Sequence, residues 1–379
     1  MSVRFLTAVS GRAFNMRDRF GREIDYMRIS VIDSCNLNCY YCNPQDNNKK
    51  CQAINILSVK KVLCIVRAAT RIGITHFRLT GGEPLLHPQI DEMVSQIKKI
   101  PGVRSVSLTT NAVLLAQHAK QLKEAGIDSI NVSLDTIDAS EYEHITKKPL
   151  LDKVEHGIDD TIECGIRVKI NAVLTPQTDV VALTRYASKK GTDIRFIEMM
   201  PVGEGHTNGV EPYKKVIGTL SELYGEPYHV NTGKTKEINS GYNKYKEERK
   251  NPDNGPAEYY IFPELDIRVG LIQAIHGKFC DTCNRIRVTA DGRLMPCLGS
   301  SVTMDLVPDS CEFTDDLEKD FVIVQALKAA IKAKPGCHNF NDNAVTYTKT
   351  TETKTVETKA TELKAAEVNA ARNMSRIGG

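Results

Sequence analysis

Residues 33–44 have the sequence DSCNLNCYYCNP. Its cysteines, Cys35, Cys39 and Cys42, follow the spacing C-x3-C-x2-C, so one loop can bring three thiolates to a single metal centre. A cubic iron–sulfur cluster with four protein ligands is coordinatively full. A local set of three therefore favours a cluster with one iron left open for a small molecule. A zinc knuckle and unrelated buried thiols are the alternatives for this stretch.

Composition narrows the class of protein. The chain has 379 residues, of which 41% are hydrophobic, so it can build one large α/β domain with an appendage, or two domains. With 50 basic and 47 acidic residues the net charge is +3, which gives no basic footprint for nucleic acid. No run approaches the roughly 20 apolar residues of a membrane span. We therefore expect a soluble, cytoplasmic protein that binds neither nucleic acid nor membrane.

The eleven cysteines divide into two groups of three and five scattered residues. Tight clusters favour metal binding over a disulfide framework in an intracellular chain. The scattered cysteines are expected to be ordinary thiols: Cys51, Cys64, Cys164, Cys311 and Cys337.

Short β-branched runs alternate with amphipathic stretches of helix length between residues 26 and 198. Strand–helix repeats are typical of a parallel sheet with right-handed crossovers, and six such strands are two short of a complete (β/α)8 barrel. We expect strands at 26–32, 74–79, 103–108, 127–134, 167–174 and 193–198, and helices at 59–71, 88–99, 114–125, 151–164 and 179–189.

Polar or glycine residues follow each of these strands, where ligands bind in parallel α/β sheets. The first strand leads into the cysteine loop, and the second ends at TGGEP, residues 80–84. The remaining strand ends carry residues 109–111, residues 133–135, Lys169 with Asn171, and residues 198–201. The topology and the cysteine motif therefore predict a cofactor site at the same edge of the sheet.

A second cysteine group lies beyond residue 213, where the alternation stops. Cys280 and Cys283 are followed by Cys297, and the Asp-Gly pair at 291–292 predicts a hairpin that folds Cys297 back towards them. This group again has three ligands where structural zinc wants four. His276 could complete a zinc site; the other interpretation is a second iron–sulfur cluster with an open iron.

Arg285 and Arg287 follow the second cysteine group and share one face of a strand. Two planar guanidinium groups suit a polyphosphate, although a solvated strand face is the plainer interpretation. Residues 317–332 are expected to form a helix, and residues from about 342 are too rich in Thr, Lys, Glu and Ala to order themselves.

The motifs resemble those of a known family. C-x3-C-x2-C with an aromatic residue before the last cysteine resembles the radical S-adenosylmethionine (SAM) superfamily. With Arg28, the GGEP turn, the CNRIR stretch at 283–287 and the ending RNMSRIGG at 372–379, the chain resembles the GTP 3′,8-cyclase family. The resemblance covers about residues 14–340 and the last eight.

The resemblance implies an incomplete (β/α)6 TIM-like radical SAM barrel with a C-terminal iron–sulfur cluster domain. We expect the barrel at 1–212, the cluster domain at 213–341, a low-complexity linker at 342–371 and a Gly-Gly tail at 372–379. It implies two [4Fe–4S] clusters, held by Cys35, Cys39 and Cys42 and by Cys280, Cys283 and Cys297, with SAM at the open iron of the first.

The resemblance also assigns the other site residues. Those implied to line the SAM site are Tyr41, Gly82, Ser133 and Met200. Those implied to contact GTP are Arg28, Arg78, Thr109, Lys169, Arg285 and Arg287, with Arg195 facing the same end of the barrel. The residues implied to take part in catalysis are Arg285, Arg287, Gly378 and Gly379.

The activity implied is that of a lyase that cyclises GTP to (8S)-3′,8-cyclo-7,8-dihydroguanosine 5′-triphosphate, the first step of molybdenum cofactor biosynthesis. A deoxyadenosyl radical would take the ribose 3′ hydrogen, and the carbon radical would attack guanine C8. The implied partners are an electron-donating redox protein, cyclic pyranopterin monophosphate synthase as the next enzyme, and a second copy in a homodimer. The alternatives are a radical SAM peptide maturase with an auxiliary cluster and a zinc-stabilised, non-catalytic nucleotide-binding protein.

Three residues depart from the usual pattern of the family. Ser34 stands in place of arginine, Asn43 in place of methionine, and Ala112 in place of glycine. None of the three is a candidate ligand. The linker at 342–371 is the larger departure, because it separates the Gly-Gly tail from the body of the chain.

Overall fold

The computed structural model describes residues 16–42, 54–201, 212–230, 255–300, 302–306, 316–338 and 340. Asn43, the linker at 342–371 and the tail with Gly378 and Gly379 lie outside the described residues.

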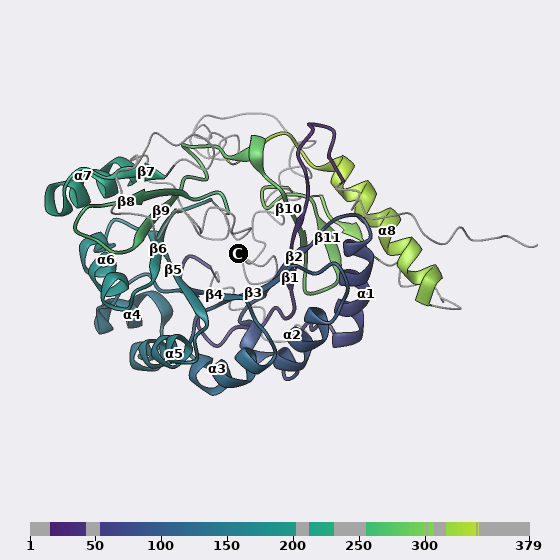
Figure 1. Ribbon diagram of the computed structural model, residues 1–379, viewed down its shortest axis with the longest axis horizontal. Helices are drawn as coiled ribbons and strands as arrows, with labels where there is room; N and C mark the ends of the chain where they lie inside the picture. The colour runs from purple at the N-terminus through teal and green to yellow at the C-terminus, as the bar shows by residue number, and fades with distance from the viewer. Residues whose placement is uncertain are drawn as a thin grey trace, which may run out of the picture.

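All twelve strands of the described chain belong to one sheet, in the order β12-β11-β10-β1-β2-β3-β4-β5-β6-β9-β8-β7. The six predicted strands are confirmed as its parallel core: β1 Tyr26–Ser30, β2 His76–Thr80, β3 Ser105–Thr110, β4 Ser129–Ser133, β5 Arg167–Leu174 and β6 Asp193–Glu198. The strands curve into an arc with helices along its outer side, as Figure 1 shows. The predicted incomplete barrel is therefore confirmed.

The helices outside the arc connect successive strands. The five predicted ones are α1 Val59–Thr70, α2 Ile90–Lys98, α3 Leu115–Glu124, α5 Leu151–Glu163 and α6 Val180–Lys189. Side chains of Ser58 and Asp179 accept from the first turns of α1 and α6, which is why these helices begin there. A short helix that was not predicted, α4 Ala139–Thr146, starts in the same way at Asp138.

The C-terminal part of the chain extends both edges of this sheet. β9 Arg268–Ile272 pairs in parallel with β6, and β10 Arg285–Val288 pairs in parallel with β1. The antiparallel strands β8 Glu258–Ile261 and β7 Tyr228–Val230 continue one edge, and β11 Arg293–Met295 and β12 Met304–Asp305 continue the other. The arc thus contains eight parallel strands, two more than the sequence predicted.

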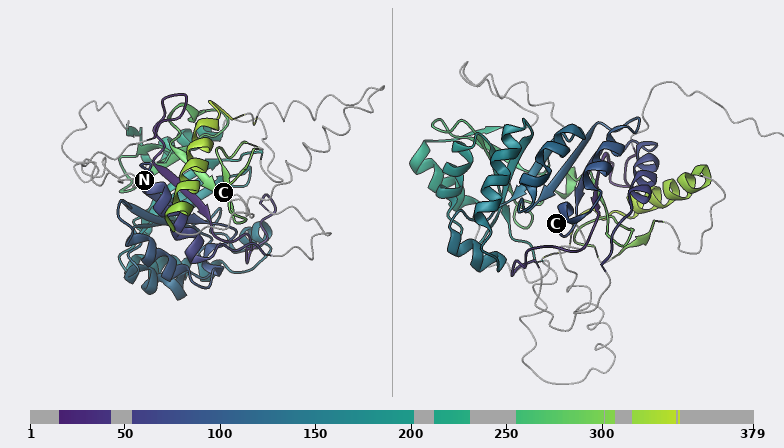
Figure 2. Two further views of the ribbon diagram at one scale, coloured as in Figure 1. Left: turned by 90° about the vertical axis from the view of Figure 1, so that its right-hand side faces the viewer. Right: turned by 90° about the horizontal axis from the view of Figure 1, so that it is seen from below.

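Two predicted features of this C-terminal part are confirmed. Gly292, with φ of +85°, makes the turn between β10 and β11, where its N–H donates to the Thr289 carbonyl at 2.9 Å. The helix expected at 317–332 is α8 Asp316–Ala333. It packs against α1, where Arg71 pairs with Asp320 at 2.8 Å, and Figure 2 shows the two helices side by side. The remaining helix, α7 Pro212–Tyr224, packs against α6.

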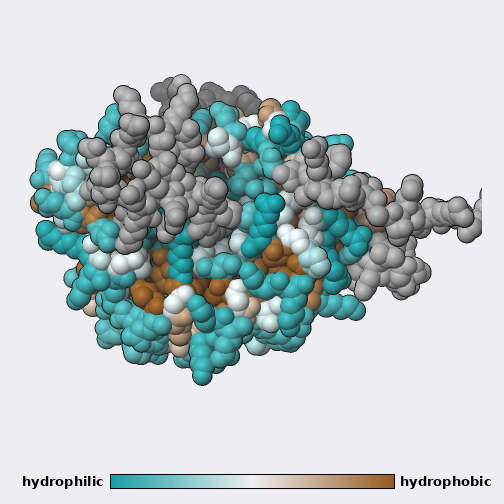
Figure 3. All heavy atoms as spheres, viewed as in Figure 1, coloured by the Kyte–Doolittle hydropathy of each residue, from teal (hydrophilic) through white to brown (hydrophobic). Residues whose placement is uncertain are grey.

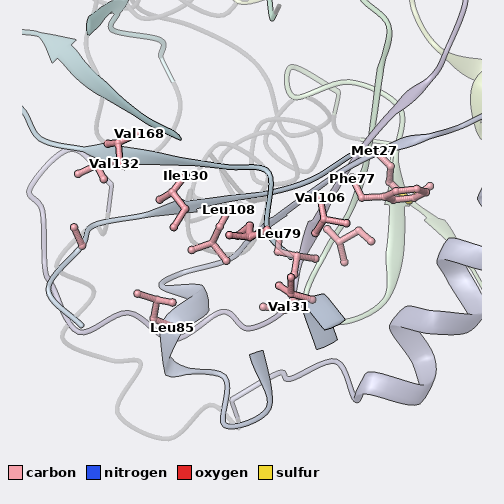
Figure 4. Packing of buried hydrophobic residues seen from close by; sticks show 14 of the residues in the cluster. Met27, Val31, Phe77, Leu79, Leu85, Val106, Leu108, Ile130, Val132 and Val168 are labelled. Carbon is pink, nitrogen blue, oxygen red and sulfur yellow. The ribbon is translucent and has the colours of Figure 1, made fainter. Parts of the chain in front are cut away.

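Apolar side chains on the outer face of the strands form the main core. Met27, Phe77, Leu108, Ile130 and Val168 project from five neighbouring strands into one layer, as Figure 4 shows. From the side seen in Figure 1, the space-filling view shows apolar side chains surrounded by hydrophilic ones (Figure 3). Successive strand residues point to opposite faces. The residues between these core positions therefore face the inside of the arc, and most of them are polar.

None of the helices in the described part of the chain is both long and apolar enough to span a membrane.

Candidate active site

The first cysteine loop leaves β1 at the carboxyl edge of the sheet. Cys35 Sγ accepts the N–H of Leu37 at 3.4 Å, and the Cys42 N–H donates to the Cys39 carbonyl at 3.0 Å. Burial raises the pKa of Cys39, and the charges of Asp135, Cys42 and Cys35 add to the rise. All three cysteines are free thiols within one loop. Soft thiolate ligands grouped in this way suit an iron–sulfur cluster.

Gly82 lies directly against the backbone of this loop. Its N–H donates to the Ile32 carbonyl at 2.7 Å, and the next N–H, of Glu83, donates to the Ser34 carbonyl at 2.8 Å. A Cβ built on Gly82 would stand 2.1 Å from the Ser34 oxygen. Only glycine lets the turn after β2 approach the cysteine loop this closely.

Glu83 connects that turn to the loop after β3. Its carboxylate, 1% exposed, accepts from Thr110 Oγ1 and the Asn111 N–H, both at 2.7 Å. Burial raises the pKa of Glu83 to about 7. The Asn111 side chain donates to Asn36 Oδ1 at 2.7 Å and approaches Cys35 Sγ at 3.7 Å. Glu83 thus fixes the residue that touches the first cysteine, a role that the sequence analysis did not assign.

Tyr41 is held by the end of β4. Its hydroxyl donates to Asp135 Oδ2 at 2.5 Å, while Asp135 Oδ1 accepts the Val173 N–H at 2.7 Å. Burial raises the pKa of Asp135. The sequence places Asp135 at a strand end without indicating a role for it, and the structure identifies Asp135 as the anchor of Tyr41.

Because the family resemblance predicts that Tyr41 lines SAM, Asp135→Ala is expected to weaken SAM binding by roughly 10- to 100-fold, as a buried charged hydrogen bond contributes about 1.5–3 kcal/mol. Anaerobic calorimetry of SAM with the reconstituted protein measures it, and Asp152→Ala, an exposed carboxylate on α5, is the matched control. Unchanged SAM affinity in Asp135→Ala would show that Tyr41 needs no anchor.

Three arginines form a row on the inner face of the arc. Arg28 on β1 is paired in register with Arg287 on β10 and with Arg78 on β2. Neighbouring strands lie about 4.8 Å apart, so the three stems stand side by side. Burial, followed by the charges of Arg287 and Arg285, lowers the pKa of Arg28. Burial and Arg285 lower the pKa of Arg287 to about 10. We name Arg287, Arg28 and Arg78 the arginine row.

Further polar side chains line the inner face beyond this row. Lys169, 1% exposed, is in register with Asn131, which is itself in register with Thr109. Arg195, 4% exposed, donates from Nε to Asn171 Oδ1 at 2.8 Å. In the described part of the chain, Arg28 Nε, Arg195 Nη2 and Asn131 Oδ1 are buried without a hydrogen-bond partner. Buried polar atoms left in this state are typical of a site for a polar ligand.

The second cysteine group adjoins the arginine row. Cys280 begins the short 3₁₀ helix η4 Cys280–Thr282, and Cys283 ends it. Burial acts to raise the pKa of Cys283, but the positive charges of Arg285 and Lys334 outweigh it, and the pKa falls to about 6. Cys297 and Cys283 in turn interact electrostatically with Arg287. The second cysteine group and the arginine row therefore lie next to each other, at β10 and β1.

His276, which could complete a zinc site with the second cysteine group, is held by Glu198. His276 donates from Nδ1 to Glu198 Oε1, and Glu198 Oε2 accepts two backbone N–H groups, of Ile275 and His276. Across the described residues, no three His, Cys, Asp or Glu side chains converge as ligands of one metal ion. Each thiolate of a four-iron cluster binds a different iron, so such a set does not converge on one point.

The remaining predicted residues are only partly placed together. Ser133 ends β4 and Met200 follows β6, both at the carboxyl edge of the sheet. Gly378 and Gly379 lie outside the described residues.

Comparisons with known proteins decide the family. Residues 29–183 match the family model described as the Radical SAM superfamily, and residues 192–340 match the one described as Molybdenum Cofactor Synthesis C. The GTP 3′,8-cyclase of Clostridium perfringens (strain SM101 / Type A) is 35% identical over 330 residues, which is 86% of this chain and 95% of that protein. The chain belongs to the GTP 3′,8-cyclase family.

A second member of the GTP 3′,8-cyclase family, from Listeria monocytogenes, is 35% identical over 85% of this chain and 92% of its own. Membership of the Radical SAM superfamily implies a [4Fe–4S] cluster and SAM as cofactors. Streptococcus suis SuiB bound to S-adenosylmethionine is a similar solved structure, with a TM-score of 0.53 and 16% identity over 82% of this chain and 68% of SuiB. That likeness shows the shared fold alone.

One departure from the GTP 3′,8-cyclase pattern has a structural consequence. Ala112, where the family commonly has glycine, adopts φ of +65° in the left-handed region. A side chain there costs roughly 1–2 kcal/mol. The loop keeps this conformation because Thr110 Oγ1 accepts the Ala112 N–H at 3.0 Å.

Proposed function

We propose that this chain catalyses the radical cyclisation of GTP to (8S)-3′,8-cyclo-7,8-dihydroguanosine 5′-triphosphate, the first step of molybdenum cofactor biosynthesis. The arginine row is the observation that carries this proposal. Like charges on neighbouring strands repel each other. Burial is the main cause of the lowered pKa values of Arg28 and Arg287, and the charges of neighbouring arginines lower them further. A triphosphate compensates such a row, because each guanidinium binds phosphate oxygens through a planar fork.

The SAM-binding cluster is assigned to Cys35, Cys39 and Cys42. The close approach of Gly82 to Ser34 and the Asn111 contact with Cys35 support this assignment, since both shape the loop around the thiols. Tyr41, Gly82, Ser133 and Met200 are proposed to line SAM. The cluster and SAM together supply the radical chemistry.

The second cluster is assigned to Cys280, Cys283 and Cys297, with its open iron towards the guanine base. Its support is the electrostatic contact of Cys283 and Cys297 with Arg287. The second cysteine group and the arginine row are neighbours, so one GTP molecule could place its base at the cluster and its triphosphate on the arginine row. Arg28, Arg78, Thr109, Lys169, Arg285 and Arg287 are the proposed GTP contacts.

The protein contributes position and exclusion of water. Lys169 and Arg195 are buried on the inner face, so charges there act in a medium that screens them weakly. Gly378 and Gly379 remain proposed members of the site. We also propose that a redox protein donates electrons to this enzyme and that cyclic pyranopterin monophosphate synthase receives its product. The enzyme is further proposed to form a homodimer and to be cytoplasmic.

Family membership sets aside the two alternative functions. The peptide maturase interpretation rests on the cysteine groups alone, whereas the chain is 35% identical to a GTP 3′,8-cyclase over 86% of its length. The zinc-binding interpretation leaves the Radical SAM match without an explanation.

Arg285→Ala tests the proposed site. It is expected to weaken GTP binding by roughly 10- to 100-fold, as truncation of a charged contact costs about 2–5 kcal/mol when it is buried and less when, like Arg285, it is partly exposed. SAM cleavage should stay largely intact. The measurements are GTP affinity by equilibrium dialysis and 5′-deoxyadenosine formation.

Arg293→Ala provides the control, because Arg293 lies on the adjacent strand β11 with an exposed side chain. Loss of SAM cleavage in Arg285→Ala with GTP affinity unchanged would contradict the assignment.

A further inference from the structure

The five residues after α8, residues 334–338, adjoin the second cysteine group. Lys334 comes directly after the helix and is 2% exposed. Its ammonium donates to the Arg285 carbonyl at 2.8 Å and to the Pro296 carbonyl at 2.9 Å. These carbonyls belong to the backbone beside Cys283 and Cys297 respectively. One buried side chain thus ties together two ligand-bearing segments that are not adjacent in sequence.

The positive charge of this ammonium also helps to lower the pKa of Cys283. A lysine ammonium has three donors. In Lys334 two of them meet carbonyls, of Arg285 and Pro296. Both carbonyls lie in segments that carry cysteines of the second group, so the role of this buried charge lies within that group.

Two other side chains fix the strap 334–338 in place. Arg22, paired with Asp18 at 2.6 Å, donates to the carbonyls of Cys280 and Pro335, both at 2.7 Å. His338 Nε2 donates to the Ala274 carbonyl at 2.6 Å. All three cysteine segments are therefore connected to the strap, two through Lys334 and one through Arg22.

We propose that Lys334 is a positioning residue for the second cluster: its ammonium sets the spacing of Cys283 and Cys297 and places a fixed positive charge beside the cluster. This inference rests on the second cluster of the proposed function. Partners of metal ligands orient those ligands and tune the metal. Hydrogen bonds to cluster sulfurs and nearby charge set the reduction potential.

Removing this charge has two consequences. The reduced cluster carries one more negative charge than the oxidised one, so a neighbouring cation stabilises reduction, and its loss lowers the potential. The two ligand segments also lose their common hydrogen-bond donor, so the cluster is released more readily to a chelator.

The test uses the full chain with Cys35, Cys39 and Cys42 replaced by serine, so that any iron belongs to the second group. In this background Lys334→Met removes the charge and Lys334→Arg keeps it. Lys332→Met is the matched control, since Lys332 lies in the last turn of α8 with an exposed side chain. Each protein is reconstituted anaerobically, and iron per chain, the rate of cluster loss to a chelator and the potential by EPR-monitored titration are measured.

The parent and Lys332→Met should hold about four irons per chain with the same potential. Lys334→Met should lose its cluster several-fold faster and titrate at a lower potential, while Lys334→Arg stays near the parent in potential. Circular dichroism of the metal-free proteins shows whether each variant is folded. If Lys334→Met is unfolded, Lys334→Arg decides instead. The proposal is then supported when Lys334→Arg has the reduction potential of the parent but loses its cluster faster than the parent.

The outcomes distinguish a failure of the proposed second cluster from a failure of the proposed role of Lys334. A parent that binds no cluster overturns the proposed second cluster, and the role of Lys334 with it. A folded Lys334→Met with the parent's potential and rate of cluster loss overturns the role of Lys334 alone. If Lys334→Met does not fold, two results for Lys334→Arg also overturn that role. One is a rate of cluster loss equal to that of the parent, and the other is a reduction potential different from that of the parent.

Discussion

Gly82→Ala is expected to reduce SAM cleavage by about 10²-fold or more, the loss that a displacement of about 1 Å at a reacting centre can cause. The added Cβ would lie 2.1 Å from the Ser34 oxygen and 2.4 Å from its carbonyl carbon. Both atoms belong to backbone, which has no flexible end to move aside. The cysteine loop must therefore shift, and Cys35, the next residue after Ser34, must shift with it.

The measurement is 5′-deoxyadenosine formed from SAM and dithionite by the reconstituted variant, together with its iron content. Gly218→Ala is the matched control, because Gly218 lies within α7 and a Cβ there meets nothing within 4 Å. A Gly82→Ala protein that cleaves SAM at the normal rate would show that the loop does not depend on this close approach.

Arg28→Met is expected to weaken GTP binding by roughly 30-fold to more than 10³-fold, the equivalent of about 2–5 kcal/mol for truncating a charged contact in a binding site. Arg28 is the middle member of the arginine row, with Arg287 on one side and Arg78 on the other. Its loss removes the guanidinium that both neighbours flank. Arg28→Lys keeps the charge without the planar fork, so it should recover only part of the affinity.

Anaerobic calorimetry with GTP checks this expectation on the reconstituted enzyme. Arg104→Met serves as the control, since Arg104 precedes β3 with an exposed side chain. If Arg28→Met bound GTP as tightly as the unaltered chain, the arginine row could not be the triphosphate site.

Local sequence patterns were sufficient for the parallel core. Each core strand needs apolar residues on its outer face, and Phe77 and Leu79 in β2, or Ile194 and Phe196 in β6, supply them at a spacing of two. The short helix α4 was missed because it comes directly before α5, where a single crossover helix was expected.

The two extra parallel strands could not be predicted in the same way. β9 and β10 come from segments without strand–helix alternation, and a local pattern does not name the partner of a strand. β10 pairs with β1 from the other end of the chain, which only the folded arc reveals. The predicted domain boundary at 212/213 stays a prediction, with the C-terminal strands hydrogen-bonded into the same sheet.

In the candidate site, too, some residues could be predicted from local sequence and others only from the folded chain. Arg285 and Arg287 were predicted to share a strand face, and Ile286 and Val288 in the core confirm it. Asp135 gave a signal, because it follows a strand end in a parallel sheet. Lys334 gave none: it is one of many lysines, and only the turn after α8 buries it against Arg285 and Pro296.

The central claim is best tested by the reaction itself. The protein is reconstituted anaerobically with iron and sulfide and incubated with SAM, dithionite and either GTP or ATP, and the products are identified by mass spectrometry. The account predicts 5′-deoxyadenosine that rises with GTP and not with ATP, together with a cyclised isomer of GTP. Cleavage of SAM that is indifferent to GTP, with no cyclised nucleotide, would contradict it and favour a peptide substrate.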